Sequence, residues 1–373
     1  MKDDSVGSKF QFLDGLRGIA ALMVLIGHAK WLLHEGYSEG FLTHPHLYNA
    51  IDKAGLFFFR IFRFGHEAVM FFFVLSGFLI HHNYARKLSI GIRVKSIDYS
   101  SFYWRRMVRI FPPFLISLLI TYLLDQFGYY LGFSIYTNST PYPSVNLAVT
   151  HFLDLKTLVG NLFLILEPTV KNFGSNSVTW SLKFEWWFYM LYPLFFLLVV
   201  RSSWLAYGAV ILLWLLSFVP EIWPLKMMQQ ISTLFICWWF GVFLADVRAG
   251  RIQISSKGIF LGLLSLFVAP FIQNAIVYDF MISAFFVGLV AFLFTLSEEN
   301  WLIKAINRFN GIGKFSYTLY IIHFPILVFM SGWLIHTSGF LPIHSGFILI
   351  GLALVLVLSY VVSLIVEKPF FRK

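Results

Sequence analysis

The first long apolar stretch of the chain, residues 12–33, contains the run Asp14-Gly15-Leu16-Arg17-Gly18-Ile19-Ala20-Ala21-Leu22-Met23-Val24-Leu25-Ile26-Gly27-His28. A helix needs about 20 mostly apolar residues to cross the hydrocarbon core of a bilayer. This stretch is long enough, yet it carries an arginine and a histidine. The sequence therefore predicts a membrane-spanning helix with ionisable groups, which usually mark a site or a pathway.

Nine further stretches are apolar enough to be membrane-spanning helices. The ten predicted spans are residues 12–33, 66–85, 108–130, 181–200, 203–220, 231–247, 258–274, 279–297, 314–334 and 345–366. A shorter run, 157–167, ends at Glu167-Pro168 and predicts an interfacial or re-entrant segment. We therefore expect an all-α, polytopic transmembrane bundle of about ten helices, forming one membrane domain over residues 1–373 with no fused soluble domain.

The composition supports a membrane protein and argues against a nucleic-acid partner. Hydrophobic residues make up 58% of the chain and charged residues only 12%, whereas soluble domains carry about 25% charged residues. The formal net charge of +10 is better explained by basic loops that face the cytoplasm. A single cysteine, Cys237, excludes an internal disulfide framework.

The distribution of Lys and Arg predicts the orientation of the chain. The basic groups of the predicted inner loops are Arg86, Lys87, Arg93, Lys95, Arg105, Arg106 and Arg109, then Arg248, Arg251 and Lys257, then Lys304, Arg308 and Lys314, and finally Lys368, Arg372 and Lys373. The predicted outer segments 132–155, 275–278 and 335–344 contain no Lys or Arg. Because Lys and Arg are enriched in cytoplasmic loops, both termini are expected in the cytoplasm.

Arg17 and His28 are predicted to share one helix face. They are eleven residues apart, which at 100° per residue is three turns plus about 20°, or about 16 Å along the axis. Arg17 would then lie near the cytoplasmic surface and His28 in the outer half of the membrane. The alternatives are an arginine that extends to the interface and a packed, hydrogen-bonded histidine.

Glu185, in the fourth predicted span, is expected at a depth similar to that of His28. Ser181, Glu185 and Tyr189 repeat at a spacing of four residues and so line one helix face. A carboxylate beside an imidazole can fix its tautomer and stabilise its protonated form. The alternatives are a structural pair with Lys183 and a carboxylate that interacts with the dipole at the helix start.

Polar residues on two further spans could contribute to a site. Ser316, Tyr320 and His323 share a face of the ninth span, where helix packing through hydrogen bonds is an equal alternative. In the second span, Ser76-Gly77 favours close helix approach, with a nucleophilic serine as the other interpretation. His66 and Glu67 lie at the outer mouth of that span, where they could contact a substrate or cap the helix.

Arg106 and Arg109 are i, i+3 neighbours at the cytoplasmic end of the third span. Two guanidinium groups on one face could bind phosphates through paired hydrogen bonds, although a topology signal or anionic-lipid contact would look the same. The sequence has neither a Walker loop nor a Rossmann glycine signature, and His66 with His81-His82 does not form a metal-site pattern. No metal is expected.

Five of these strings, in this order, resemble the acyltransferase-3 family of membrane acyltransferases. They are Arg17 with His28, Phe72-Phe73-Val74-Leu75-Ser76-Gly77-Phe78, Arg106 with Arg109, Trp180-Ser181-Leu182 with Glu185, and Ser316-Tyr317-Thr318-Leu319-Tyr320 with His323. The resemblance implies about ten core helices and transfer of acyl groups, commonly acetyl, from a cytoplasmic coenzyme A thioester. Met70 departs from the family, since many members have an acidic residue there, and the periplasmic esterase-like domain fused to some members is not expected here.

The resemblance also implies the partners, and the layout of the polar residues suggests a mechanism. The expected acceptor is a carbohydrate or glycolipid, such as a sugar of lipopolysaccharide, exopolysaccharide, a lipo-oligosaccharide or peptidoglycan, or else a small secondary metabolite. The expected location is a bacterial inner membrane.

Arg106 and Arg109, with Arg17, would hold acyl-coenzyme A as a donor substrate and not a tightly bound cofactor. His28 would act as general base with Glu185, near Ser76, Glu67, Ser181, Ser316, Tyr320 and His323. An acyl-enzyme route through His28, and a transporter of a glycan or lipid-linked sugar, are alternatives. The oligomeric state is left open.

Overall fold

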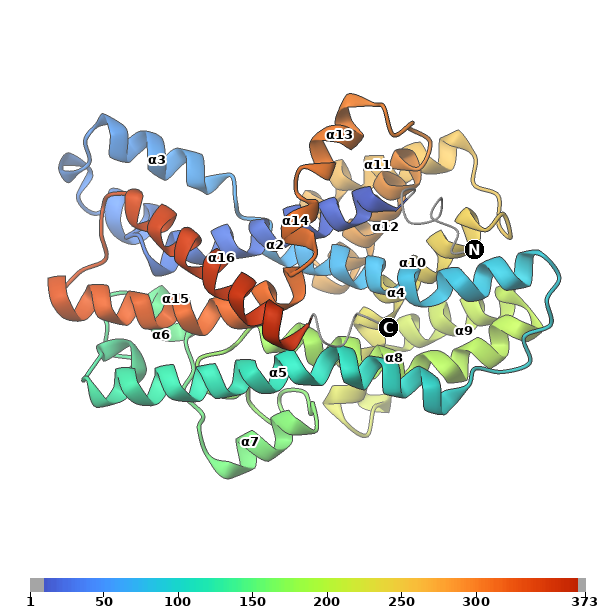
Figure 1. Ribbon diagram of the computed structural model, residues 1–373, viewed down its shortest axis with the longest axis horizontal. Coiled ribbons are helices and arrows are strands. Elements are labelled where there is room, and N and C mark those ends of the chain that lie inside the picture. The colour runs from blue at the N-terminus through green and yellow to red at the C-terminus, as the bar shows by residue number, and fades with distance from the viewer. Residues whose placement is uncertain (1–9, 368–373) are drawn as a thin grey trace. The chain divides into compact units, whose positions relative to one another are not determined.

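Helices make up the regular structure of the computed structural model, which describes residues 10–367 (Figure 1). Within those residues the only β-type pairing is an isolated bridge between Phe152 and Gly174, with no strand. An all-α protein is therefore confirmed. Lys368, Arg372 and Lys373, the last of the predicted inner basic groups, lie outside the described residues.

Eight helical stretches of the described chain are long and apolar enough to cross a membrane. They are Gln11–Phe41, Ala50–Ser89, Tyr99–Tyr130, Thr179–Arg201, Lys226–Arg248, Ala275–Leu293, Ser316–Ser338 and Gly346–Val366. Each matches a predicted span. The other two predicted spans, 203–220 and 258–274, correspond to the shorter apolar helices Ser203–Leu216 and Ser256–Phe271. The protein is thus built to pass the membrane several times, while the count of ten and the cytoplasmic termini stay predictions.

The packing divides the chain into two units, each assembled from separate parts of the sequence. The first unit consists of Met1–Gly65, Met107–Trp180 and Ile306–Lys373. Its helices are α2 (Gln11–Leu32), α3 (Ala50–Arg60), α6 (Pro143–Ala148), α7 (Leu155–Leu162), α14 (Asn310–Gly313), α15 (Ser316–Ser338), α16 (Gly346–Val366) and most of α5 (Tyr99–Tyr130).

The second unit consists of His66–Arg106 and Ser181–Ala305. It holds α4 (Gly65–Ser89), α8 (Thr179–Arg201), α9 (Ser203–Leu216), α10 (Lys226–Arg248), α11 (Ser256–Val268) and α12 (Ala275–Leu293), together with the start of α5. Helix α13 (Trp301–Asn307) lies across the boundary between the two sequence ranges. Candidate spans occur in both units.

In the first unit, α2 packs against α14, α15 and α16. Glycines allow α2 to lie very close to the segment around α14. A Cβ atom on Gly18 would lie 2.4 Å from the carbonyl oxygen of Phe309, and one on Gly313 would lie 1.9 Å from that of Asp14. Both distances are far inside van der Waals contact, so only glycine fits. This packing fixes the end of α2 that carries Arg17.

In the second unit, α4 and α10 approach each other backbone to backbone. A Cβ atom on Gly77 would lie 2.1 Å from the carbonyl oxygen of Trp238, and one on Gly241 would lie 1.9 Å from that of Val74. Small residues at helix crossings are typical of membrane proteins, where close backbone approach increases van der Waals contact. The interpretation of Ser76-Gly77 as a helix-approach motif is therefore confirmed.

Several segments contain more helix than the sequence predicted. Helix α5 begins at Tyr99, ahead of the predicted start at 108. The helix therefore includes the basic residues that precede the apolar run. The predicted orientation also places two long segments, 34–65 and 131–180, outside the membrane, and these contain α3, α6 and α7. Helix α7 has 8 residues and rises only about 12 Å, so the run 157–167 does not cross a membrane as one helix.

Candidate active site

The imidazoles of His28 and His323 contact each other within the first unit. His28 lies on α2 and His323 on α15, and their Nδ1 and Nε2 atoms are 2.8 Å apart. The rings are stacked, with centroids 5.1 Å apart and planes 13° from parallel. Two of the predicted site residues, 295 positions apart in the sequence, thus form one pair.

One backbone carbonyl sets the direction of the hydrogen bond between the two rings. Nδ1 of His323 lies 3.1 Å from the carbonyl oxygen of Leu319, which can only accept, so Nδ1 of His323 carries the proton. In the neutral ring, Nε2 of His323 is then an acceptor, and Nδ1 of His28 must donate to it. The remaining nitrogen of His28, Nε2, therefore has a free lone pair and is the basic atom of the pair.

His28 is more exposed than His323, as expected if His28 carries the basic nitrogen and His323 supports it. His323 is 1% exposed, whereas His28 is only half-buried. Trp31 and Phe324 contact the His28 ring edge-on, with centroids 6.2 Å and 5.0 Å away. The aromatic neighbours hold the His28 ring in place, and His323 supports it from the protein interior.

Tyr320 and Ser316 lie on α15 with His323, as predicted, but they bond to the backbone. The Tyr320 hydroxyl donates to the carbonyl oxygen of Val178 at 3.3 Å, and its ring centroid lies 5.9 Å from that of His323. The fully buried Ser316 hydroxyl donates to the carbonyl oxygen of Gly313 at 2.8 Å. Tyr320 adjoins the histidine pair, whereas Ser316 stabilises the start of α15.

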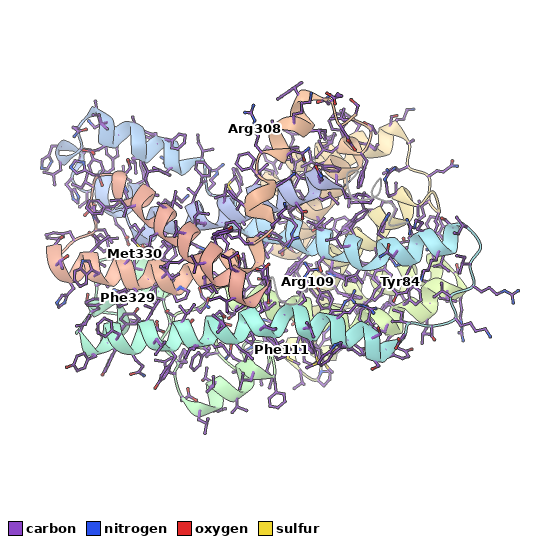
Figure 2. The ribbon with its side chains drawn as sticks, in the orientation of Figure 1. Tyr84, Arg109, Phe111, Arg308, Phe329 and Met330 are labelled. Atoms are coloured by element: carbon purple, nitrogen blue, oxygen red, sulfur yellow. The ribbon has the colours of Figure 1, made fainter. Side chains whose placement is uncertain are left out.

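Arg17 lies in a cluster of charges at the start of α2. Its guanidinium pairs with Asp14 at 3.3 Å, and the Arg17 side chain is 18% exposed. The guanidinium also interacts electrostatically with Arg109 on α5, which Figure 2 labels, and with Glu367 after α16. Glu367 accepts hydrogen bonds from the backbone nitrogen of Thr318, at 3.0 Å, and from its hydroxyl. The structure thus brings Arg17 and Arg109 together from two separate helices.

A directed hydrogen-bond chain holds Glu185 in the second unit. The Tyr189 hydroxyl donates to Glu185 Oε1 at 2.5 Å, so the hydroxyl of Ser76, 2.9 Å from that of Tyr189, must donate to Tyr189 Oη. Trp238 Nε1 in turn donates to Ser76 Oγ at 3.2 Å. The predicted stacking of Glu185 and Tyr189 is confirmed, and Ser76 acts as a link between α4, α8 and α10.

The remaining predicted site residues of the second unit lie on three helices. Glu67 on α4 accepts a hydrogen bond from the hydroxyl of Tyr278 on α12. Ser181 is 5% exposed at the start of α8. Arg106 on α5 donates to the carbonyl oxygen of Phe102 at 3.3 Å and lies 4.1 Å from the centre of that ring. Their contacts with a substrate stay predictions, as does the approach of Glu185 to His28.

A family model described as an acyltransferase domain, Acyl_transf_3, matches residues 10–366. The chain belongs to the acyltransferase-3 family. Acyltransferase MdmB of Streptomyces mycarofaciens is 25% identical over 392 aligned residues, which cover 96% of this chain and 91% of the relative. No solved structure matches the chain.

The family assignment confirms the resemblance and identifies the protein as an acyltransferase. The eight long apolar helical stretches of residues 10–367 are those of a multi-pass membrane protein. Neither comparison supports the transporter alternative. Within residues 10–367, no cluster of three or more His, Cys, Asp or Glu side chains is placed to hold a metal ion.

The acyltransferase also has polar clusters that the sequence did not reveal. His81 and Asp246, both fully buried, lie 3.1 Å apart, and Tyr192, Tyr207 and Arg251 complete their hydrogen bonds. In the sequence, His81-His82 indicates at most an incomplete metal-site pattern. Because every partner comes from a distant segment, no local spacing could have indicated this cluster, which ties α4 to α8, α9 and α10.

A second cluster lies in the predicted outer segments of the first unit. Glu35, 7% exposed, accepts hydrogen bonds from the hydroxyls of Tyr48 and Tyr142 at 3.3 Å and 3.2 Å and contacts His44 Nε2 at 2.6 Å. Burial and the nearby Glu35 raise the pKa of both tyrosines, so both remain donors at physiological pH. The backbone nitrogen of Leu341 donates to the Tyr142 hydroxyl at 2.8 Å. Glu35 therefore joins the segments around Tyr48 and Tyr142, and Tyr142 joins them to the segment around Leu341.

Proposed function

We propose that this acyltransferase moves an acetyl group from cytoplasmic acetyl-coenzyme A to a hydroxyl of a cell-surface or lipid-linked carbohydrate, in a bacterial inner membrane. The observation that carries the proposal is the His28–His323 pair. It leaves an unprotonated Nε2 on a half-buried side chain and a buried acceptor behind it. That is the arrangement of a general base with a group that supports its charged form.

The proposed reaction is a direct transfer. His28 Nε2 takes the proton of the acceptor hydroxyl while the oxygen attacks the thioester carbonyl carbon. A C–O bond forms, the C–S bond breaks, and the departing thiolate takes the proton back from His28. The positive charge that His28 bears in between is stabilised because its Nδ1–H donates to His323. A positioned general base contributes about 10²–10⁴-fold to a rate, and a thioester is already activated.

Arginines on two helices support the choice of donor. Arg17 and Arg109 interact across α2 and α5, and guanidinium groups bind phosphates through paired hydrogen bonds. Arg17 and His28 are about 16 Å apart along the axis of α2, a separation that a long, thin pantetheine arm can cover. Arg106 is proposed as a further phosphate ligand, and Glu185 as a carboxylate that assists the base, both on sequence grounds.

The proposal is tested by substituting the base. His28→Ala and a matched control, the exposed His46→Ala, are expressed at equal levels in cells that lack the gene. Surface and lipid-linked glycans are then analysed by mass spectrometry for the added mass of one acetyl group. We expect His28→Ala to lose the modification and His46→Ala to retain it. Unchanged acetylation in His28→Ala would rule out this mechanism.

The donor is tested separately with purified protein. Arg17→Ala should raise KM for acetyl-coenzyme A far more than it lowers kcat, because a phosphate ligand acts on binding. Arg17→Lys keeps the charge and loses the fork of donors, so an intermediate KM is expected. If KM were the same in all three proteins, Arg17 would not contact the donor.

A further inference from the structure

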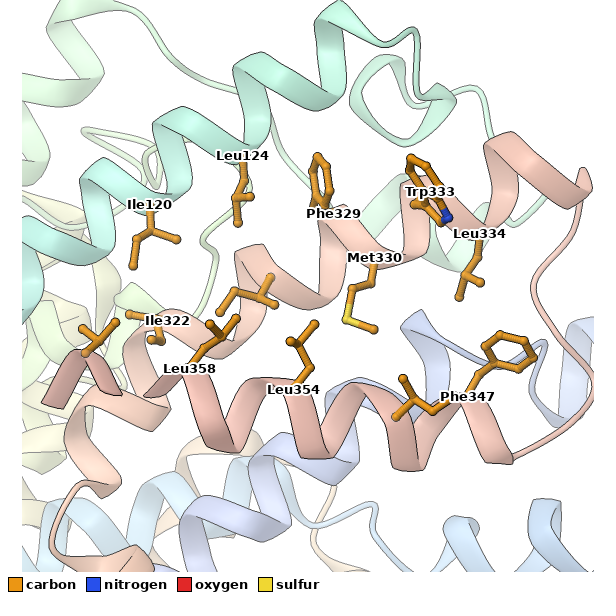
Figure 3. Close-up of a pocket in the computed structure, with 13 residues that line it drawn as sticks. Ile120, Leu124, Ile322, Phe329, Met330, Trp333, Leu334, Phe347, Leu354 and Leu358 are labelled. Atoms are coloured by element: carbon orange, nitrogen blue, oxygen red, sulfur yellow. The ribbon is translucent and has the colours of Figure 1, made fainter. Parts of the chain in front are cut away.

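An elongated apolar cavity lies in the first unit between α5, α15 and α16 (Figure 3). Its volume is about 570 Å³, and all 13 residues that line it are Ile, Leu, Val, Met, Phe or Trp. The volume falls within the range of about 300–1,000 Å³ that is common for small-molecule sites. Apart from the indole N–H of Trp333, the lining has no polar side-chain group, which suits an apolar ligand.

The lining residues follow one face of each helix. On α15 the series Ile322, Ile326, Met330 and Leu334 repeats every four residues, and Figure 3 shows Met330 directed between α15 and α16. From Ile322 to Leu334 the helix rises about 18 Å. The cavity is therefore a groove that runs along the helices, and its length is close to half of the roughly 30 Å hydrocarbon core, the depth of one leaflet.

The groove is continuous with the surface that faces lipid. Its inner wall is buried, with Ile322 0% and Ile326 7% exposed, whereas Leu354 and Leu358 on α16 are 42% and 38% exposed. Both α15 and α16 are candidate membrane spans. A groove with a buried floor and an open apolar side can be entered sideways from the bilayer core.

We propose that this groove binds one acyl chain of a membrane phospholipid. Over a length of about 18 Å, a volume of about 570 Å³ leaves a mean cross-section of about 30 Å². A helix from a second protein copy, about 10–12 Å across with its side chains, does not fit inside the groove, whereas a single extended chain does. The adjustable Met330 side chain suits a ligand of variable shape. The site is distinct from acyl transfer, because no histidine, serine or charged residue lines it.

The test uses the full-length protein in vesicles that contain phosphatidylglycerol with a photoreactive diazirine on one acyl chain. Leu354→Trp/Leu358→Trp fills the groove. The matched control, Leu349→Trp/Val361→Trp, alters the same helix at exposed residues that do not line the groove. After irradiation, cross-linked α15 peptides are quantified by mass spectrometry, and thermal unfolding is compared to check that both variants are folded.

Labelling of α15 should fall by about fivefold or more in the filled variant, a ratio that corresponds to roughly 1 kcal/mol, and should stay near wild type in the control. Equal labelling in both variants would overturn the proposal, as would displacement of the probe by a polyprenyl phosphate but not by unlabelled phosphatidylglycerol. If the filled variant does not fold, wild-type protein decides the question: cross-links at Phe329 or Met330 support a bound chain, and cross-links confined to exposed residues such as Leu349 exclude it.

Discussion

The basic nitrogen of His28 depends on a carbonyl group four residues from its partner. Leu319 fixes the proton of His323, which in turn fixes the proton of His28. Sequence periodicity placed both histidines inside the membrane, but it could not show that α2 and α15 are neighbours at that depth. The tautomer could therefore be deduced only once the two rings were seen together.

Substituting His323 tests its role as the support of the base. His323→Leu removes the acceptor of the His28 Nδ1–H, and we expect kcat to fall by about 10–100-fold, as for groups that orient a metal-bound imidazole. His323→Gln can accept from His28 and donate to Leu319, so it should recover most of that loss. KM for acetyl-coenzyme A should not change in either variant. Equal kcat losses in the two variants would indicate a packing role only.

Ser76 is predicted to be dispensable for the chemical step. Its hydroxyl donates to Tyr189 and accepts from Trp238, so it serves as a structural link. In Ser76→Ala we expect a modest loss of thermal stability. The acetylation rate should fall far less than the ~10²–10⁴-fold expected when a catalytic group is removed. Acetylation measured with purified protein decides this, and a rate as low as that of His28→Ala would restore the nucleophilic interpretation.

At the scale of helices, the crossing of α4 and α10 depends on the absence of side chains. In Gly241→Ala the new Cβ would lie 1.9 Å from the carbonyl oxygen of Val74, so the helices must move apart, at a cost of about 1–3 kcal/mol. The matched control is Gly208→Ala on α9, where nothing lies within 4 Å of the new atom. Thermal unfolding in detergent should show a lower midpoint for Gly241→Ala, with Gly208→Ala unchanged or slightly stabilised. Equal midpoints would show that the crossing tolerates separation.

Helices were the most predictable feature because about 20 consecutive apolar residues have few other possible structures. The predicted span 12–33 became α2, Gln11–Leu32, and 345–366 became α16, Gly346–Val366. The helix α3 was not predicted, although Asn49 and Asp52 form a capping box at its start that local sequence could have revealed. Which helices pack together was not predictable, since hydrophobicity alone does not choose partners.

For the whole molecule, the number of crossings depends on α9 and α11. Helix α9 has 14 residues and rises about 21 Å, less than the roughly 30 Å of hydrocarbon, so flanking residues must complete a crossing. The prediction of ten spans rests on the charges: without these two crossings, Arg248, Arg251 and Lys257 would face outward, against the positive-inside rule.

Cysteine labelling tests this topology. In a Cys237→Ala background, we expect a membrane-impermeant maleimide to label Glu221→Cys and Leu147→Cys in intact cells. Lys95→Cys should react only after permeabilisation. All three positions are exposed. If Glu221→Cys reacted only in permeabilised cells, α9 would not cross and the count of ten would be wrong.

The Glu35 cluster has a consequence for attempts to redirect the enzyme to new acceptors. Glu35 accepts hydrogen bonds from Tyr48 and Tyr142, and the Tyr142 hydroxyl accepts one from the backbone of Leu341, so the segments around these residues are held together. Grafting residues 131–180 from a relative without a tyrosine at position 142 would leave the buried Glu35 carboxyl group one hydrogen-bond donor short. Chimaeras should therefore exchange these three segments together, as a single cassette.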